Sequence, residues 1–237
     1  MLSIAKKSVE IGLKEICFTD HLEYAVAGST WTVDALVDFG NYKAEISSLK
    51  KQFSSVLDIK CGIEIGMHPD TIDKLRDYMK DVELDFIMCS LHEIEPAGHQ
   101  AVAKYLKTML HCIKKAPHFS VVGHLDFFKR YISYDDEKIF KANFEILESI
   151  LKTIIDKGSG IEVNTSGFRY GLGQPLPSRD ILTLYKDLGG EIITTGSDAH
   201  KLCDLGHNFE YTYDLLKDIG FKYVTTFDNM EPIFIKI

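Results

Sequence analysis

The sequence predicts a parallel α/β fold in a single domain, and three observations support this prediction. Short apolar runs rich in β-branched residues alternate with polar loops and amphipathic stretches, which is the strand, loop and helix order of parallel sheets. A length of 237 residues with 45% hydrophobic side chains suffices for one large core, and α/β barrels commonly reach this size undivided. Carboxylate and imidazole side chains follow several apolar runs, where barrels carry their functional groups. We therefore expect residues 1–237 to fold as one barrel or doubly wound sheet.

The strands are predicted from short apolar runs that are bounded by polar or glycine-containing loops. These runs cover residues 15–19, 56–66, 84–91, 119–123, 161–163 and 192–195, followed by a closing strand at 221–227 and a tail strand at 233–237. The helices are predicted from apolar residues at helical spacing and from stop signals such as Gly12 and Gly220. They cover the residues before Gly12 and the stretches 33–49, 70–80, 136–157, 177–188 and 204–219.

The composition argues against several classes of partner. The chain has 27 basic and 35 acidic side chains and a net charge of −8, which disfavours nucleic acid and anionic membranes as main partners. No apolar run reaches the roughly 20 residues of a membrane span, and the first residues lack the apolar core of a signal peptide. The five cysteines are scattered without a C-x-x-C pattern, so we expect reduced structural thiols. These features predict a cytoplasmic protein.

Asp198 and His200 are the first candidate metal ligands. They follow the β-branched run at 192–195, after Gly196 breaks the predicted strand. Side chains two positions apart in an extended segment share one face, so this carboxylate and this imidazole can reach the same point. One hard oxygen and one borderline nitrogen suit a divalent metal. The alternative is a local hydrogen-bonded pair, so the hypothesis depends on similar groups at other strand ends.

Four other side chains meet that requirement. His21, His92 and His124 each close an apolar run, and Glu64 lies within one. An unpaired buried carboxylate costs several kcal/mol, so Glu64 should meet a cation, which is either a metal or a lysine. His21 alone is equally compatible with a helix cap or a loop histidine. Independent core histidines would not gather at strand ends, so we predict one metal-ligand set: His21, Glu64, His92, His124, Asp198 and His200.

Four imidazoles and two carboxylates exceed the needs of one tetrahedral zinc ion and indicate two or more ions with open positions. Such centres hydrolyse phosphate esters or amides. Arg130 and Arg169, with Lys129 as a weaker candidate, lie past strand ends on the same side of the fold, where a guanidinium can bind phosphate oxygens bidentately. Surface salt bridges are the alternative for each arginine. The mixed ligand set leaves zinc, manganese and iron open.

Six short motifs carry these residues. They are Phe18-Thr19-Asp20-His21, Gly62-Ile63-Glu64, Ser90-Leu91-His92, Gly123-His124 with Lys129-Arg130, Glu162-Val163-Asn164-Thr165-Ser166-Gly167 and Ser197-Asp198-Ala199-His200. In order, they resemble the motifs of the polymerase and histidinol phosphatase (PHP) family, and the contexts of Arg130 and Arg169 resemble its histidinol-phosphate phosphatase branch. The resemblance covers nearly the whole chain. It implies a distorted (β/α)7 barrel with a trinuclear centre of zinc, iron or manganese and a metal-bound hydroxide that attacks phosphorus.

The resemblance also implies a role for each candidate. Glu64 would bridge two ions, His92 and His124 would complete one site, and Asp198 and His200 would serve the others. His21 would be a ligand or lie against the centre. The catalytic candidates are His21, Asp198 and Arg130. The candidates for substrate binding are Arg130, Arg169, Lys129 and Asn164.

The chain departs from the family pattern at its start. Family members open with a strand that ends in His-x-His and continue with an acidic residue in the next loop, whereas this chain starts with the first helix at Met1. We therefore expect a barrel without its first strand, with unpaired neighbouring edges. Because every later motif is intact, we favour the interpretation that Met1 is not the natural start over that of a damaged or repurposed member.

The leading functional hypothesis is a phosphatase for L-histidinol phosphate in histidine biosynthesis, with a small phosphorylated substrate as its partner. A related phosphoesterase would act on a nucleotide or a short oligonucleotide end, although the acidic balance disfavours the oligonucleotide. A non-catalytic metal-binding remnant is the alternative outside enzymes. Metal content distinguishes them, since a complete centre holds up to three ions and a remnant fewer. The sequence leaves the oligomeric state open.

Overall fold

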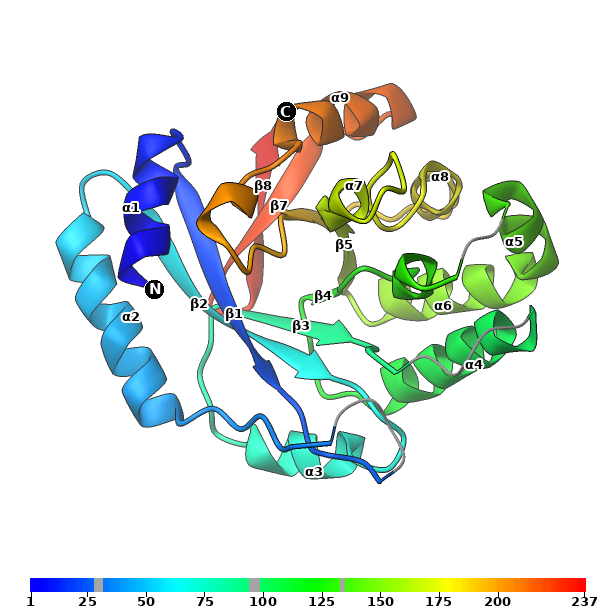
Figure 1. The fold of residues 1–237 in the computed structure, drawn as a ribbon, viewed down its shortest axis with the longest axis horizontal. Coiled ribbons are helices and arrows are strands. Elements are labelled where there is room, and N and C mark those ends of the chain that lie inside the picture. Colours follow the sequence, from blue (N-terminus) through cyan, green and yellow to red (C-terminus); the bar gives the residue numbers. More distant parts are fainter. Residues whose placement is uncertain (28–31, 94–98, 133–134) are drawn as a thin grey trace.

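The computed structural model describes residues 1–27, 32–93, 99–132 and 135–237. Within these residues, six parallel strands form one curled sheet whose spatial order follows the chain (Figure 1). The strands are β1 (Glu15–Leu22), β2 (Asp58–Gly66), β3 (Phe86–Ser90), β4 (Val121–Val122), β5 (Gly160–Asn164) and β6 (Ile193–Gly196). Helices follow most of these strands, so the predicted α/β alternation and parallel pairing are confirmed.

The helices lie along the outer side of the curled sheet and cover its hydrophobic core (Figure 1). They are α1 (Leu2–Glu10), α2 (Phe39–Phe53), α3 (Ile72–Tyr78), α4 (His99–Lys115), α5 (Asp136–Ala142), α6 (Phe144–Asp156), α7 (Ser166–Arg169), α8 (Arg179–Asp187) and α9 (Phe209–Ile219), with 3-10 turns η1 (Phe127–Arg130) and η2 (Leu202–Asp204). In the described residues, none of them combines the length and apolarity needed to cross a bilayer. Ile46 of α2, Leu106 of α4 and Ile150 of α6 are buried in the core, and each such side chain contributes about 1.5–3 kcal/mol.

The strand register places two candidate ligands in one layer inside the sheet. His21 of β1 pairs with Glu64 of β2, and Glu64 pairs with Met88 of β3. Because side chains alternate along a strand, the next residues Leu22 and Ile65 point the other way, into the helix-covered core, where both are buried. His21 and Glu64 therefore face the concave side of the sheet, and His21 Nε2 lies 3.8 Å from Glu64 Oε2.

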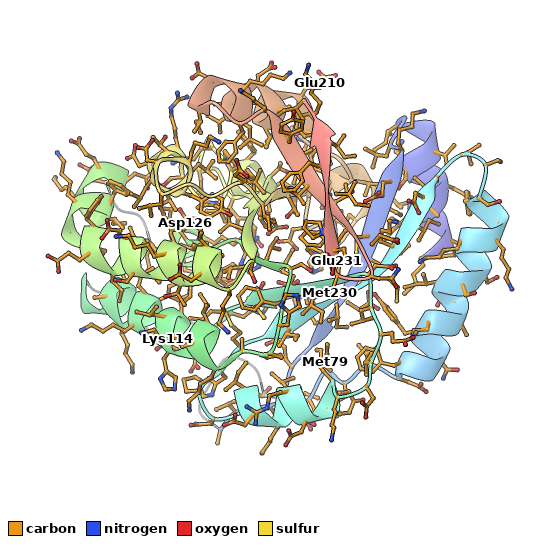
Figure 2. All side chains as sticks on the ribbon, turned by 180° about the vertical axis from the view of Figure 1, so that it is seen from behind. Met79, Lys114, Asp126, Glu210, Met230 and Glu231 are labelled. Carbon is orange, nitrogen blue, oxygen red and sulfur yellow. The ribbon has the colours of Figure 1, made fainter. Side chains whose placement is uncertain are left out.

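Two further strands, β7 (Tyr223–Asp228) and β8 (Glu231–Lys236), form an antiparallel hairpin beside β6. Its turn residues Asn229 and Met230 have φ values of 49° and 68°, the positive range of a two-residue type I′ hairpin turn. Met230 lies at the end of this hairpin in Figure 2. Thr225 Oγ1 of β7 accepts a hydrogen bond from the backbone of β6 at 3.2 Å. The predicted closing and tail strands are both present, and they pair with each other.

The sheet is a half-barrel that does not close within the described residues. β1 forms one edge, and the hairpin follows the opposite end of the sheet. A cavity of about 1250 Å³ lies between them, lined by Cys17 and Thr19 of β1 on one side and by Thr195 and Thr226 on the other. This open edge agrees with the expectation of a barrel without its first strand.

The helix predicted at 33–49 begins later, as α2. Ala35 instead forms an antiparallel bridge with Glu23, with two backbone hydrogen bonds of 2.8 Å. The helix starts only after Asp38, whose carboxylate accepts a hydrogen bond from the Asn41 N–H at 3.1 Å and so caps it. Tertiary pairing of the loop therefore overrides the helical spacing of its apolar residues.

Two other predicted boundaries differ from the structure. The single helix predicted at 136–157 is two helices, α5 and α6, which meet at Asn143, where the side-chain amide donates to the Ile139 carbonyl at 2.9 Å. That side chain offers the backbone a competing hydrogen bond, which interrupts the helix. The strand predicted at 15–19 continues through residue 22, so His21 lies within β1 and not after it.

Charged side chains gather near the other end of the strands, away from the candidate ligands. Lys60 Nζ lies 3.0 Å from Asp58 Oδ2 and 3.1 Å from Asp228 Oδ1. Glu15 pairs with Asp58 in the register of β1 and β2. Burial raises the pKa of Glu15, Lys60 opposes this change, and the charges of Asp58 and Asp228 add to it, so that the pKa is about 7.

We predict that Glu15→Gln stabilises the protein increasingly as the pH rises from 5 to 8. The pKa of Glu15 is raised from 4.5 to about 7 by folding, so its contribution to stability is complete below pH 4.5 and is lost as the pH rises through 7. Because the side chain is partly exposed, we expect a gain on the order of 1 kcal/mol at pH 8. Denaturant unfolding of both proteins at pH 5 and pH 8 measures it.

The control is Glu210→Gln, which changes an exposed carboxylate on α9 (Figure 2). Its unfolding free energy should follow that of the unchanged protein at both pH values. An equal effect of Glu15→Gln at pH 5 and pH 8 would contradict the raised pKa.

Candidate metal centre

Three predicted ligands converge on one buried point at the carboxyl ends of neighbouring strands. Glu64 lies in β2, His92 follows β3 and His124 follows β4. The Nε2 atoms of His92 and His124 both lie 3.2 Å from Glu64 Oε1, and the centroids of the two rings are 5.2 Å apart. Parallel strands end on the same side, which brings residues far apart in sequence together. The donor atoms of all three residues lie within 4.8 Å of one another.

The electrostatics of this cluster fit a divalent metal. Burial opposes the ionisation of Glu64, but hydrogen bonds from His124 and His92 outweigh it and hold the pKa of Glu64 well below its usual value. Burial would also lower the pKa of His92, yet its bonds to two carboxylates raise this pKa to about 10. Burial lowers the pKa of His124, whose Nδ1 has no hydrogen-bond partner among the described residues. Two imidazole nitrogens and one carboxylate oxygen form a donor set for zinc and related ions, which replace shared protons on binding.

Glu23 belongs to the same cluster, although the sequence analysis did not identify it. Its Oε1 lies 3.0 Å from His21 Nδ1 and 2.7 Å from His92 Nδ1. The bond to Glu23 raises the pKa of His21, whereas burial opposes that increase. The donor atoms of His21, Glu23 and His92 also lie within 4.8 Å of one another. The signal in the sequence is the two-residue spacing from His21, which places both side chains on one face of the extended chain at the end of β1.

Asp198 and His200 lie at the rim of the site, where His200 Nδ1 is 3.4 Å from Asp198 Oδ1. The loop after β6 places Asp198 at a left-handed φ of 50°. Its Oδ2 accepts a hydrogen bond from Arg130 at 2.5 Å. The His200 side chain is 71% exposed, and its ring centroid lies 6.2 Å from that of His21. Four of the predicted ligands line the large cavity: His21, Glu64, Asp198 and His200.

Arg130 is held rigidly beside Asp198. The guanidinium lies between the rings of Phe127 and Tyr170, 4.5 Å and 4.6 Å from their centroids. It also donates to Ser166 Oγ at 2.5 Å, and its buried Nε has no hydrogen-bond partner among the described residues. Stacking and directed hydrogen bonds suit an arginine that binds a planar or tetrahedral anion.

Arg169 donates to the loop that carries Asp198. Its two terminal nitrogens bond to the carbonyl oxygens of Ser197 at 2.7 Å and Asp198 at 2.8 Å. Its Nε lies 3.7 Å from Asp204. These bonds satisfy two carbonyls beside a left-handed residue, so Arg169 stabilises the conformation of the loop.

Lys129, another predicted substrate-binding residue, is buried in an ion-pair network. Its Nζ lies 3.0 Å from Asp126 Oδ2 and 2.7 Å from Asp136 Oδ1. The same carboxylate of Asp126 accepts a hydrogen bond from the backbone of Ser178 at 3.0 Å. The structure therefore gives this ammonium two acidic partners within the protein.

Asn164 contacts a second buried carboxylate that the sequence analysis did not single out. Glu162 is 3% exposed and accepts hydrogen bonds of 3.0 Å from the Asn164 amide and from the His124 backbone N–H. Burial, together with the charges of Asp198 and Glu64, raises the pKa of Glu162 to about 8. This network fixes the end of β4 where His124 enters the cluster.

Comparisons with known proteins identify the family of this chain. The model of the family described as PHP domain matches residues 1–166. The histidinol-phosphatase of Lactococcus lactis subsp. lactis (strain IL1403) is 29% identical over 95% of this chain and 87% of its own length. A probable histidinol-phosphatase of Thermotoga maritima is 27% identical over 96% of this chain and 88% of its own length.

Solved structures have the same fold. A histidinol phosphate phosphatase from L. lactis, complexed with zinc, L-histidinol and phosphate, has a TM-score of 0.82 and 27% identity and covers 98% of this chain and 92% of its own. A putative histidinol phosphatase from Listeria monocytogenes has a TM-score of 0.76 and 22% identity over 88% of this chain and 92% of its own. Because the family model matches 166 of 237 residues, the chain belongs to the PHP domain family.

Proposed function

We propose that this protein is a metal-dependent phosphomonoesterase that hydrolyses L-histidinol phosphate to L-histidinol and phosphate in histidine biosynthesis. The observation that carries the proposal is the convergence of Glu64, His92 and His124 on one buried point, at the end of the sheet where Arg130 pairs with Asp198. The ligands of the similar L. lactis enzyme, which are zinc, L-histidinol and phosphate, support this choice of metal and substrate.

Bound divalent ions, with zinc favoured and iron or manganese as alternatives, would supply Lewis-acid activation of the phosphate ester and of water. Glu64, His92 and His124 would hold one ion. His21, Asp198 and His200 at the rim would contribute to further positions, with up to three ions in all. Asp198 can do so while it pairs with Arg130, because its Oδ2 faces Arg130 and its Oδ1 lies 3.4 Å from His200 Nδ1.

The phosphate would bind beside Asp198. Arg130 would donate to phosphate oxygens and offset the charge that develops on them, since its guanidinium is held between two rings before substrate arrives. Arg169 would bind phosphate only by releasing one of its two loop carbonyls. Asn164 would orient its neighbours through Glu162. Lys129 would act on the substrate less directly than the two arginines, because it already pairs with two carboxylates of the protein.

We also propose that residues 1–237 act as one cytoplasmic domain on a small phosphorylated molecule. The free thiols of the described structure support a reducing compartment; they are Cys17, Cys61, Cys89, Cys112 and Cys203. The net charge of −8 disfavours a nucleic-acid substrate.

Phosphate release from L-histidinol phosphate tests the proposed function directly. After zinc reconstitution we expect turnover that a chelator abolishes, with bound zinc counted on the same sample. Turnover that persists without metal would contradict the proposal. Hydrolysis of nucleoside monophosphates alone would favour the related phosphoesterase, and metal binding without any turnover would favour the non-catalytic remnant.

We predict that His92→Ala and Asp198→Ala each lower kcat at least a hundredfold. His92→Ala removes one of three converging donors and should also lower the zinc content, which atomic absorption measures. The control is His111→Ala, which removes an exposed imidazole on α4 and should leave both quantities unchanged. Full activity in either ligand variant would refute the site assignment.

We predict that Arg169→Ala mainly weakens phosphate binding, with KM and the inhibition constant of inorganic phosphate raised about tenfold. The bound zinc should stay constant, because Arg169 donates to carbonyls and not to the metal ligands' side chains. Arg179→Ala is the matched control, since Arg179 lies on α8 in an exposed pair with Asp218. A loss of kcat at unchanged KM would show that Arg169 acts only on the Asp198 loop.

A further inference from the structure

Glu23 lies behind two of the predicted ligands, on the side away from Glu64. Glu23 Oε1 contacts the Nδ1 atoms of His92 and His21, at 2.7 Å and 3.0 Å. The Nε2 atoms of the same rings face Glu64, at 3.2 Å from Oε1 and 3.8 Å from Oε2. Two carboxylates therefore hold these imidazoles from opposite edges, one at each ring nitrogen.

This arrangement selects the tautomer that binds metal. A neutral imidazole carries one N–H, and donating it from Nδ1 to Glu23 leaves the Nε2 lone pair directed at the cluster of Glu64 and His124. A carboxylate at the other nitrogen also raises the basicity of a ligating imidazole and fixes the plane of its ring.

The position of Glu23 is itself fixed by the fold. The residue is 5% exposed, and its backbone N–H and carbonyl both bond to Ala35 at 2.8 Å. The Glu23 carboxylate occupies the space beside Gly66 of β2, where a β-carbon would overlap its Cγ, Cδ and Oε2 atoms. The absence of a side chain at Gly66 thus makes room for Glu23.

We infer that Glu23 is a positioning residue that orients His92 and His21 for metal binding through their Nδ1 atoms, and that Gly66 provides the space it needs. The inference rests on the proposed metal centre. Direct ligation by Glu23 is the competing role, since its donor atoms also group with those of His21 and His92. The geometry favours positioning, because sharing an ion with Glu23 would require His92 to bind through Nδ1, whereas its Nε2 faces Glu64 and the His124 ring.

Zinc affinity of the full chain, measured by competition with a chromophoric chelator, tests the inference. Glu23→Ala should weaken zinc binding 10- to 100-fold. Glu23→Gln keeps an oxygen that accepts both N–H bonds and should weaken it only a few-fold. Gly66→Ala changes no ligand and no carboxylate, yet it should weaken binding as Glu23→Ala does. Gly40→Ala, on the exposed start of α2, is the matched control and should bind zinc normally.

Two further measurements separate positioning from other roles. In 15N spectra of the zinc-loaded protein, His92 should bind through Nε2 and carry its proton on Nδ1, and Glu23→Ala should shift the Nδ1 signal because that N–H loses its acceptor. Loss of one ion per chain in Glu23→Gln would show direct ligation and overturn the inference. Reduced thermal stability of metal-free Glu23→Ala with unchanged zinc affinity would show a purely structural role and overturn it as well.

Zinc affinity is independent of turnover, so the two proposals can fail separately. If the unchanged chain binds zinc but does not hydrolyse L-histidinol phosphate, the proposed function fails while the role of Glu23 is still decided by the variants. If Glu23→Ala and Gly66→Ala bind zinc as tightly as the unchanged chain, the inference is wrong whatever the substrate.

Discussion

A buried carboxylate on a central strand is the constraint on which the site depends. Glu64 is 6% exposed in the second half of β2, where the neighbouring residues at 61–63 and 65–66 are apolar or small, and such a group is costly unless cations or hydrogen-bond donors surround it. The imidazoles of His92 and His124 surround the Glu64 carboxylate, because they follow the next two strands, β3 and β4, at the same end of the sheet. Parallel pairing makes this possible, because antiparallel neighbours would carry their ends to opposite sides of the sheet.

Glycines on neighbouring strands make room for a second layer of carboxylates behind the candidate ligands. Glu23 packs against Gly66, and Glu162 occupies the space where Gly196 has no side chain. Glu23 faces ring nitrogens, whereas Glu162 faces the His124 backbone. Each carboxylate fits beside its glycine only if the two neighbouring strands, β1 with β2 and β5 with β6, pair in the observed register. The hydrogen bonds of the buried polar groups therefore depend on the register of the sheet.

Periodicity and strand-end chemistry predicted much of the fold and the convergence of three candidate ligands. Short apolar runs and polar strand ends are local patterns, so the alternation of elements and the positions of Glu64, His92 and His124 follow from them. Glu23 was not identified, because a glutamate beside a strand end is common and its neighbours in sequence do not indicate burial. Its burial depends on the space beside Gly66, which lies on another strand.

The directions of the charged side chains could not be predicted. Arg130 and Arg169 both follow strand ends, yet one is stacked between rings and the other bonds to loop carbonyls. The orientation of Arg169 depends on the left-handed backbone at Asp198, and that of Arg130 depends on Tyr170, which is distant in sequence. Likewise, the division of the long helix depends on one side-chain bond of Asn143, which competes with the regular helical pattern.

The sequential strand order has a consequence for how the protein acquires its metal. Each strand of the six-stranded sheet pairs with the next strand along the chain, so these pairings are among the most local that a parallel sheet permits. β2, β3 and β4 are consecutive, so the three converging donors come from one continuous part of the chain, and Glu162 of the next strand, β5, then holds the His124 backbone through a hydrogen bond. An ion bound by these donors would therefore stabilise the pairing of β2, β3 and β4 with one another, and metal binding would be coupled to the folding of this part of the sheet.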